Sequence, residues 1–329
     1  MKQTRNCTRQ QIAEFRLSAL LAIFIFAAGT ALPLQAQTES ADGQSPSVTH
    51  NTWASGAAMP TARMGAAAGA VGTNIYVIDG YTPGSMVGVN EIYNTKKNTW
   101  TTGASDPNPR GFVASVMVNK ILYIFGGSAG EILNLTESYN PATNKWTTLA
   151  PMPYAAQSAS AVADKDVIYL IGGNDNPFLA NVASYNTTTN TWTEETPMLQ
   201  MKGWSAAALL GTTIVAADGS DTCCYLGDNE SYNLKKNTWT ELTADPNPRA
   251  VGCYAVIKGQ LYVAGGVNPN NLTVNESYNP KTKSWTTLAP MPQGILHAAA
   301  SAVAGGRMYC FGGGEFEQTV YDNVQIYQP

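Results

Sequence analysis

Six tryptophans recur along this chain at an almost constant interval, which constrains the fold more than any other feature of the sequence. The spacings between successive members are 47, 46, 46, 47 and 46 residues. The six are Trp53, Trp100, Trp146, Trp192, Trp239 and Trp285. A period of this length and regularity is typical of repeat architectures such as propellers and solenoids, in which each copy is one supersecondary unit.

Each copy carries the same features in the same order: an apolar run ending in a glycine pair, a variable loop, a tyrosine, and the tryptophan seven residues later. The glycine pairs are Gly126-Gly127, Gly172-Gly173, Gly265-Gly266 and Gly312-Gly313. Two copies read Asp79-Gly80 and Asp218-Gly219 and so keep only the second glycine. This order resembles the Kelch repeat, which is about 50 residues long. The resemblance extends from about Asn51 to Pro329.

The resemblance implies an all-β fold, a six-bladed β-propeller in which each copy forms one four-stranded antiparallel blade. Residue size supports this reading, because the segments expected nearest the crowded axis hold almost nothing larger than valine. They are residues 65–71, 158–162, 205–208 and 297–303. Tyrosine and tryptophan, which bury roughly 150–250 Å² each, would fill the wider gaps between blades further out.

The two ends of the repeat region complement each other. The last copy ends at Tyr327 to Pro329 and lacks a tryptophan strand, whereas the first begins with Asn51, Thr52 and Trp53 and lacks everything before that strand. We therefore expect the N-terminal strand to pair beside the C-terminal strand and close the last blade, since this leaves no open sheet edge in the ring.

The first 50 residues lie outside the repeats. A basic segment with Lys2, Arg5, Arg9 and Arg16 precedes an uncharged apolar run over residues 17–32 and the small residue Ala36. This pattern predicts a signal peptide over residues 1–36, a flexible leader over residues 37–50 and a propeller over residues 51–329. An uncleaved anchor is the alternative, but the run has 16 residues and a spanning helix needs ~20. We expect an exported protein, periplasmic or extracellular.

Cleavage after Ala36 would remove four of the 19 basic residues and one of the 23 acidic residues, which leaves a net charge of −7. An acidic surface argues against nucleic acid or an anionic membrane as the partner. We expect a monomer without a cofactor or metal, whose partner is a protein segment or a glycan, possibly anionic.

A shift of 139 residues superposes residues 106–110 on 245–249 and residues 146–153 on 285–292. The ring is therefore expected to consist of two related halves of three blades. The connections between strands 2 and 3 of a blade, and between strand 4 and the next strand 1, vary most in sequence. Strand parity places them on one face, where we expect binding.

A cationic residue recurs on this face, 13 residues before the strand-2 tyrosine or before Val215, which replaces it in one copy. Two residues after two of these cations stand aromatic residues. We predict a ligand-binding set at the channel mouth and assign no catalytic residue; the set is Arg63, Arg110, Phe112, Lys202, Trp204 and Arg249. The alternative is that the arginines tie neighbouring loops together through backbone carbonyls, as the corresponding region of Kelch repeats often does.

Two further groups of residues carry less weight. Glu91, Glu137, Glu230 and Glu276 each precede a tyrosine by two residues, and this repetition indicates a structural role. The cysteines Cys223, Cys224, Cys253 and Cys310 have no counterparts in the other half. Export permits disulfides, and Cys223–Cys224 and Cys224–Cys253 bridges are both open, with buried free thiols at Cys253 and Cys310 as the alternative.

These features favour a binding module over an enzyme. The enzymatic alternative is an isomerase or mutarotase of an acidic sugar, similar to the sialate mutarotases. It calls for a carboxylate beside Arg63 or Arg249, and the candidates are Asp175, Asp218, Asp221 and Glu315. A copper site like that of galactose oxidase needs two histidines and two tyrosines, whereas this chain has only His50 and His297.

Overall fold

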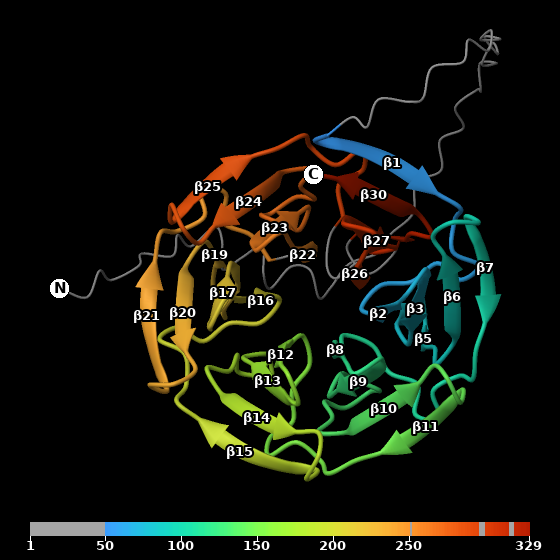
Figure 1. Ribbon diagram of the computed structural model, residues 1–329, viewed down its shortest axis with the longest axis horizontal. Coiled ribbons are helices and arrows are strands. Elements are labelled where there is room, and N and C mark those ends of the chain that lie inside the picture. Colours follow the sequence, from blue (N-terminus) through green and yellow to red (C-terminus); the bar gives the residue numbers. More distant parts are fainter. Residues whose placement is uncertain (1–49, 251, 296–299, 316–318) are drawn as a thin grey trace, which may run out of the picture. The chain divides into compact units, whose positions relative to one another are not determined.

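The computed structural model describes residues 50–250, 252–295, 300–315 and 319–329. The predicted signal peptide and all of the predicted leader except His50 lie outside them. The chain from Asn51 to Pro329 forms one compact unit. This unit is a ring of six four-stranded antiparallel sheets (Figure 1), which confirms the six-bladed propeller. Within the described ranges, no helix is long and apolar enough to cross a membrane.

The strands of each blade follow one another from the axis outward. Blades 1 to 3 consist of β2 (Ala67–Val71), β3 (Asn74–Ile78), β6 (Asn90–Asn94) and β7 (Thr99–Thr102); β8 (Ala114–Val118), β9 (Ile121–Phe125), β10 (Thr136–Asn140) and β11 (Lys145–Thr148); and β12 (Ser160–Asp164), β13 (Val167–Ile171), β14 (Val182–Asn186) and β15 (Thr191–Glu195). Blades 4 to 6 consist of β16 (Ala206–Leu210), β17 (Thr213–Ala217), β20 (Asn229–Asn233) and β21 (Thr238–Leu242); β22 (Cys253–Ile257), β23 (Gln260–Ala264), β24 (Asn275–Asn279) and β25 (Ser284–Thr287); and β26 (Ala300–Ala304), β27 (Arg307–Phe311), β30 (Val324–Gln328) and β1 (Thr52–Gly56).

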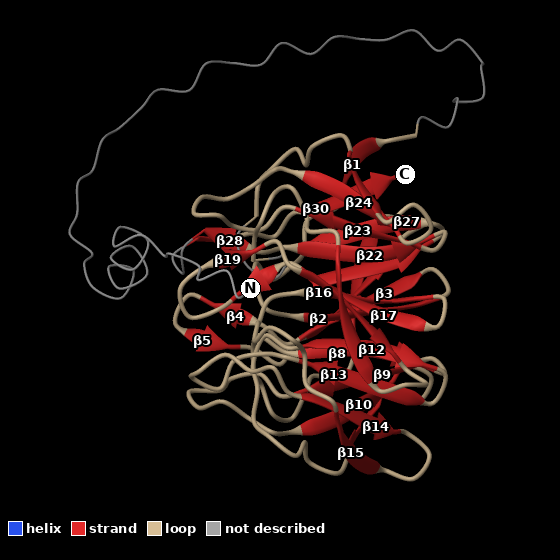
Figure 2. Ribbon diagram, turned by 90° about the vertical axis from the view of Figure 1, so that its left-hand side faces the viewer, coloured by secondary structure: helices blue, strands red, loops and turns tan. Residues whose placement is uncertain are grey.

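Three connections between strands 2 and 3 carry short hairpins. They are β4 (Tyr81–Thr82) with β5 (Ser85–Met86), β18 (Gly219–Ser220) with β19 (Tyr225–Leu226), and β28 (Gly314–Glu315) with β29 (Thr319–Val320). Figure 2 shows long loops and hairpins on one side of the ring and short turns on the other. We call the side with the hairpins the loop face.

The repeated tyrosines and tryptophans hold neighbouring blades together. Each indole N–H donates to a backbone carbonyl of the preceding blade at 2.8–3.3 Å. In five blades the tyrosine hydroxyl donates to an asparagine Oδ1 at 2.6–2.8 Å. The same oxygen accepts a backbone N–H from the preceding blade. One motif therefore closes every blade and joins it to its neighbour.

The N-terminal strand closes the last blade, as predicted. β1 pairs with β30 in antiparallel register from Thr52–Gln328 to Gly56–Val324, at the outer edge of the ring (Figure 1). Trp53 packs on Tyr327 with ring centroids 5.0 Å apart. The Tyr327 hydroxyl donates to Asn51 Oδ1 at 2.8 Å, so the same motif operates across the chain ends.

The second glycine of each pair joins blades near the axis. All six have positive φ, between 91° and 123°. Their N–H groups donate to the chain entering the next blade at 2.8–3.1 Å. At Gly266 an added Cβ would lie 2.2 Å from the carbonyl oxygen of Ala250, so a side chain is excluded there. Both the backbone conformation and the close approach that the sequence suggested are present.

The structure corrects the cysteine pairing. Cys253 on β22 and Cys310 on β27 form a disulfide between blades 5 and 6. Both expectations for these residues, free thiols or a Cys224–Cys253 bridge, are therefore wrong. Strand 1 of blade 5 packs against strand 2 of blade 6 in one apolar cluster, which brings together two cysteines 57 residues apart.

Candidate functional site: the axial cavity

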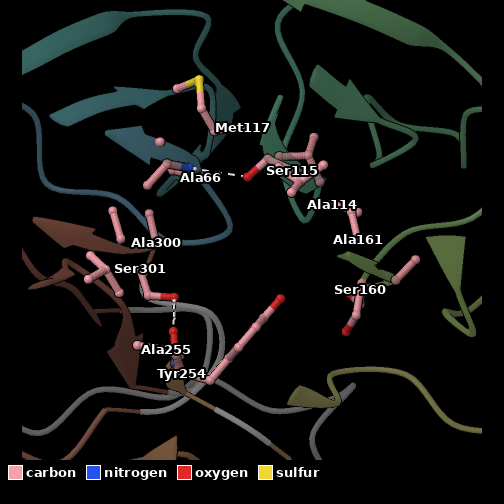
Figure 3. A pocket seen from close by; sticks show the side chains of 18 of the residues that line it. Ala66, Ala114, Ser115, Met117, Ser160, Ala161, Tyr254, Ala255, Ala300 and Ser301 are labelled. Atoms are coloured by element: carbon pink, nitrogen blue, oxygen red, sulfur yellow. Dashed lines mark hydrogen bonds between the residues drawn. The ribbon is translucent and has the colours of Figure 1, made fainter. Parts of the chain in front are cut away.

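The axis of the propeller holds a cavity of about 350 Å³. The innermost strands of five blades and the entry to the sixth line it, and small residues predominate among them. Figure 3 shows alanine and serine side chains from several blades pointing into this space. The described residues that line it include no aspartate, glutamate, histidine, lysine or arginine. The cavity is therefore neutral along its described walls.

Hydroxyl groups supply the polarity of the cavity, and several of them also join neighbouring inner strands. Ser301 donates to the Tyr254 carbonyl at 2.8 Å (Figure 3). Ser160 donates to the Ser205 carbonyl at 2.7 Å, and Ser115 accepts the Ala68 N–H at 3.3 Å. Since a hydroxyl can both donate and accept, these groups can fix the blades and still offer hydrogen bonds to a ligand.

Tyr254 is the largest polar side chain that enters the cavity (Figure 3). Burial raises the pKa of its phenol, while a hydrogen bond with Ser160 acts in the opposite direction. A raised pKa keeps this phenol protonated at neutral pH. The equivalent position in the other half is Ser115, so Tyr254 belongs to one half alone.

Backbone hydrogen bonds encircle the entrance of the cavity on the loop face. Gly65, Phe112, Ser158 and Trp204 occupy equivalent positions, each with φ between 49° and 68°. The N–H of each of the last three donates to the carbonyl of its predecessor, at 2.7, 2.7 and 2.9 Å. At Gly65 a Cβ would lie 2.6 Å from the Phe112 nitrogen, so glycine is required there. We call these four residues the mouth ring.

Two members of the mouth ring bring aromatic side chains to the cavity wall. Phe112 stacks on Tyr81 with centroids 6.3 Å apart, and Trp204 contacts Phe178 at 5.7 Å. In each pair the partner comes from the strand 2–3 connection of the preceding blade. The structure therefore places the predicted residues Phe112 and Trp204 together in one cavity lining.

The four predicted cations lie elsewhere. Their side chains are buried, with relative exposures of 0–1%, and they do not line the cavity. Each forms an ion pair with a glutamate of its own blade: Arg63 with Glu91 at 2.5 Å, Arg110 with Glu137 at 2.5 Å, Lys202 with Glu230 at 3.2 Å, and Arg249 with Glu276. The expectation that these cations are presented at the channel mouth is therefore wrong.

The left-handed backbone of the mouth ring explains this difference. Side chains two residues apart share a face only in an extended strand. Phe112 has φ of 57° and Trp204 has φ of 49°, so the chain turns before the strand begins. Arg110 therefore points back into its blade while Phe112 faces the cavity.

Each cation joins two blades through different parts of the residue. Its carbonyl oxygen accepts the N–H of the second glycine of the preceding blade, as Arg110 does from Gly80 at 2.9 Å. Its side chain binds a carboxylate of the following blade, and Arg110 also donates to the Asn108 carbonyl at 3.0 Å. This arrangement matches the alternative interpretation, in which the arginines tie neighbouring loops.

The carboxylates considered for catalysis do not line the cavity. Asp218 lies 3.5 Å from Arg249 Nε in a buried ion pair, and Asp175, Asp221 and Glu315 are also outside the lining. One group of possible metal ligands occurs in the described part of the chain, namely Asp221, Cys223 and Cys224 on the β18–β19 hairpin, and this group is separate from the cavity.

Comparison with known proteins places the chain in a family. The family model of the Attractin/LZTR1 β-propeller matches residues 75–276, which is more than half of the sequence. The chain belongs to this family. Comparison with curated proteins finds no match.

A solved structure supports the architecture of this Attractin/LZTR1-type propeller. The structure of YjhT superposes with a TM-score of 0.70 and covers 82% of this chain and 95% of its own. The two sequences are 16% identical, so the similarity concerns the fold.

Two related clusters of buried carboxyl groups distinguish blades 1 and 4 of this Attractin/LZTR1-type propeller. Asp79 faces Asp106, Arg110 and Glu137, and burial followed by the charge of Asp106 raises its pKa well above the ordinary value. Burial likewise raises the pKa of Asp106, to about 6. The shift of 139 residues produces the second cluster, Asp218, Asp245, Arg249 and Glu276, in which burial raises the pKa of Asp218. Three carboxylates around one guanidinium favour retention of a proton.

This geometry predicts that the propeller loses stability as pH rises. A carboxyl whose folded pKa exceeds the unfolded value of about 3.8 stabilises the fold most at low pH, and this contribution is lost as pH rises through the folded pKa. For Asp106 the loss falls between about pH 4 and 6. Asp79→Asn with Asp218→Asn should therefore gain roughly 1–3 kcal/mol in unfolding free energy at pH 8, and less at pH 5. Asparagine also tolerates the positive φ at both positions.

Urea unfolding at the two pH values measures this gain. The control is Asp322→Asn, because Asp322 is exposed and should show no such pH-dependent gain. A double variant that is less stable than the native chain at pH 8 would show that both aspartates are needed in their charged form.

Proposed function

We propose that this propeller is a binding module that takes a neutral saccharide, at the end of a glycan, into the axial cavity from the loop face. The observation that carries the proposal is the lining: hydroxyls and small side chains along the walls, two aromatic side chains at the entrance and no charged group among the described residues. Ligand sites typically combine apolar and aromatic walls with a few placed polar groups in about 300–1,000 Å³.

The chemistry of the lining fits a sugar in two ways. Trp204 and Phe112 provide aromatic surface, against which the C–H faces of a pyranose ring pack. Ser115, Ser160 and the Tyr254 phenol can donate and accept, as the hydroxyls of a saccharide require. Export of the mature chain, which remains our proposal, would bring the propeller into contact with glycans outside the cytoplasm.

Neutrality favours an uncharged ligand over the anionic one suggested by the repeated cations. A carboxylate entering this cavity would lose its hydration, and uncompensated burial of a charge is costly. The cations that could compensate are already paired with Glu91, Glu137, Glu230 and Glu276.

A glycan array probed with the full chain tests the proposal. We expect binding to glycans with neutral termini, and a loss of at least about tenfold in affinity, or ~1.4 kcal/mol, for Trp204→Ala. Tyr254→Phe removes a single hydroxyl and should cost about 0.5–1.5 kcal/mol. Leu199→Ala is the matched control, because Leu199 is 56% exposed and lies outside the cavity lining.

Two results would contradict the proposal. Undiminished glycan binding by Trp204→Ala would place recognition outside the cavity. Binding to peptides without binding to any glycan would favour a protein segment as the ligand. We propose no enzymatic function, because acid/base chemistry on a sugar needs a group that can take up the substrate proton, and the described lining offers no carboxylate or histidine for this step.

A further inference from the structure

Cys223 and Cys224 are adjacent residues in the loop of the β18–β19 hairpin, and their Sγ atoms lie 2.9 Å apart. Both side chains are partly exposed and both cysteines are free in this structure. Cys253 and Cys310, in contrast, are fully buried in their disulfide. The chain therefore holds one protected cysteine pair and one accessible pair.

Asp221 fixes the backbone of this loop independently of the sulfurs. Its Oδ1 accepts the N–H groups of Cys223 at 2.9 Å and Cys224 at 2.8 Å. Its own N–H donates to the Cys224 carbonyl at 3.0 Å, and Gln200 donates to its Oδ2 at 3.3 Å. The hairpin thus holds the two thiols face to face without needing a bond between them.

The fold does not explain why two cysteines stand here. The related hairpin in the other half, β4–β5, has Gly84 and Ser85 at the equivalent positions and forms the same pairing. A hairpin at this place in the blade therefore forms without thiols.

We propose that Cys223 and Cys224 are a reversible redox pair that closes to a vicinal disulfide by exchange with a small-molecule disulfide such as oxidised glutathione. One thiolate attacks the glutathione disulfide, forms a mixed disulfide and releases one glutathione thiolate. The second thiolate then attacks the protein sulfur of that mixed disulfide and releases the second glutathione. Two protein thiols become one disulfide, and one oxidised glutathione becomes two reduced molecules.

Geometry favours this chemistry over shared metal binding. Two thiolates on one tetrahedral zinc, each ~2.3 Å from the metal, lie about 3.8 Å apart. The observed separation of 2.9 Å is shorter. In addition, the Asp221 oxygens already accept three hydrogen bonds.

The pair lies beside the proposed binding site. Ser220, next to the loop, exchanges two backbone hydrogen bonds with Gly203 at 2.9 and 3.0 Å. Tyr225, which follows the loop, packs with Trp204 around Ala250 and Val267. Closing the disulfide restrains a segment that contacts the wall of the cavity entrance.

Equilibration of the full chain in glutathione buffers of graded oxidised-to-reduced ratio tests the proposal, with alkylation and peptide mapping to separate this pair from Cys7 and from Cys253–Cys310. We expect the peptide carrying Cys223 and Cys224 to lose two hydrogens as the ratio rises, at ratios where Cys253–Cys310 is oxidised throughout. The variant Cys223→Ser should instead carry one glutathione on Cys224. Two alkylatable thiols at every ratio, stable glutathione adducts on both residues, or zinc protection with no disulfide would each overturn the proposal.

Discussion

Replacing Arg110 and Arg249 with alanine should unfold much of the propeller instead of merely weakening a ligand. Each substitution leaves buried carboxylates without their cation, around Asp106 and Glu137 in one half and Asp245 and Glu276 in the other. Removing one partner of a buried ion pair costs about 3–5 kcal/mol. Since the two sites share no partner, the costs should approximately add to about 6–10 kcal/mol.

A loss of this size is comparable with the whole stability of many domains, about 5–15 kcal/mol. Urea unfolding followed by tryptophan fluorescence measures it. The matched control is Lys96→Ala with Lys235→Ala, because these lysines are also 139 residues apart but lie exposed in turns; it should change stability by less than about 0.5 kcal/mol. Native stability combined with lost ligand binding in the arginine variant would restore the cations as binding residues.

Deleting residues 1–56 should open the ring, whereas deleting residues 1–48 should change little. The longer deletion removes β1 and with it the Trp53 hydrogen bond to Ala289 and the Asn51 contact with Tyr327. Loss of a packed tryptophan alone costs about 3–5 kcal/mol. At about 2–4 °C per kcal/mol, the Tm should fall by roughly 6–20 °C.

Thermal unfolding of the two truncated chains provides the measurement, and the shorter deletion serves as the control because it leaves all of β1 in place. Equal midpoints would contradict closure of blade 6 by the N-terminal strand. A broadened transition in the longer deletion would fit a ring that has lost its cooperativity.

The fold was predictable because the period states it directly. Every repeated tryptophan, tyrosine and glycine has one inter-blade contact to make, so six copies give the same answer six times. Closure was predictable because the missing part of the last copy is present at the start of the repeat region.

The position of the cations was not predicted, although the sequence holds a signal for it. The four blades that carry a cation 13 residues before the strand-2 tyrosine position are the same four that carry a glutamate two residues before the strand-3 tyrosine. Blade 3 has Ala156 and Ala183 at these positions, and blade 6 has Leu296 and Gln325. Shared presence and shared absence indicate contact between the two positions, whereas each set taken alone does not.

Two other features depend on how neighbouring blades meet, which the repeat itself does not encode. The Cys253–Cys310 bond joins strand 1 of one blade to strand 2 of the next. Tyr254 belongs to a single blade and has no repeated counterpart to suggest that it enters the cavity. Both follow from the angle and spacing between blades.

The salt dependence of ligand affinity tests most directly whether the cavity, and not the ring of cations, performs recognition. Titration of the full chain with a neutral glycan identified on the array, at about 0.05 and 0.5 M salt, spans a large change in the screening of charges. We predict that the Kd changes by less than about twofold, because no charged group of the described lining contacts the ligand. A steep rise in Kd with salt, or tighter binding of a matched glycan ending in a carboxylate, would contradict the account.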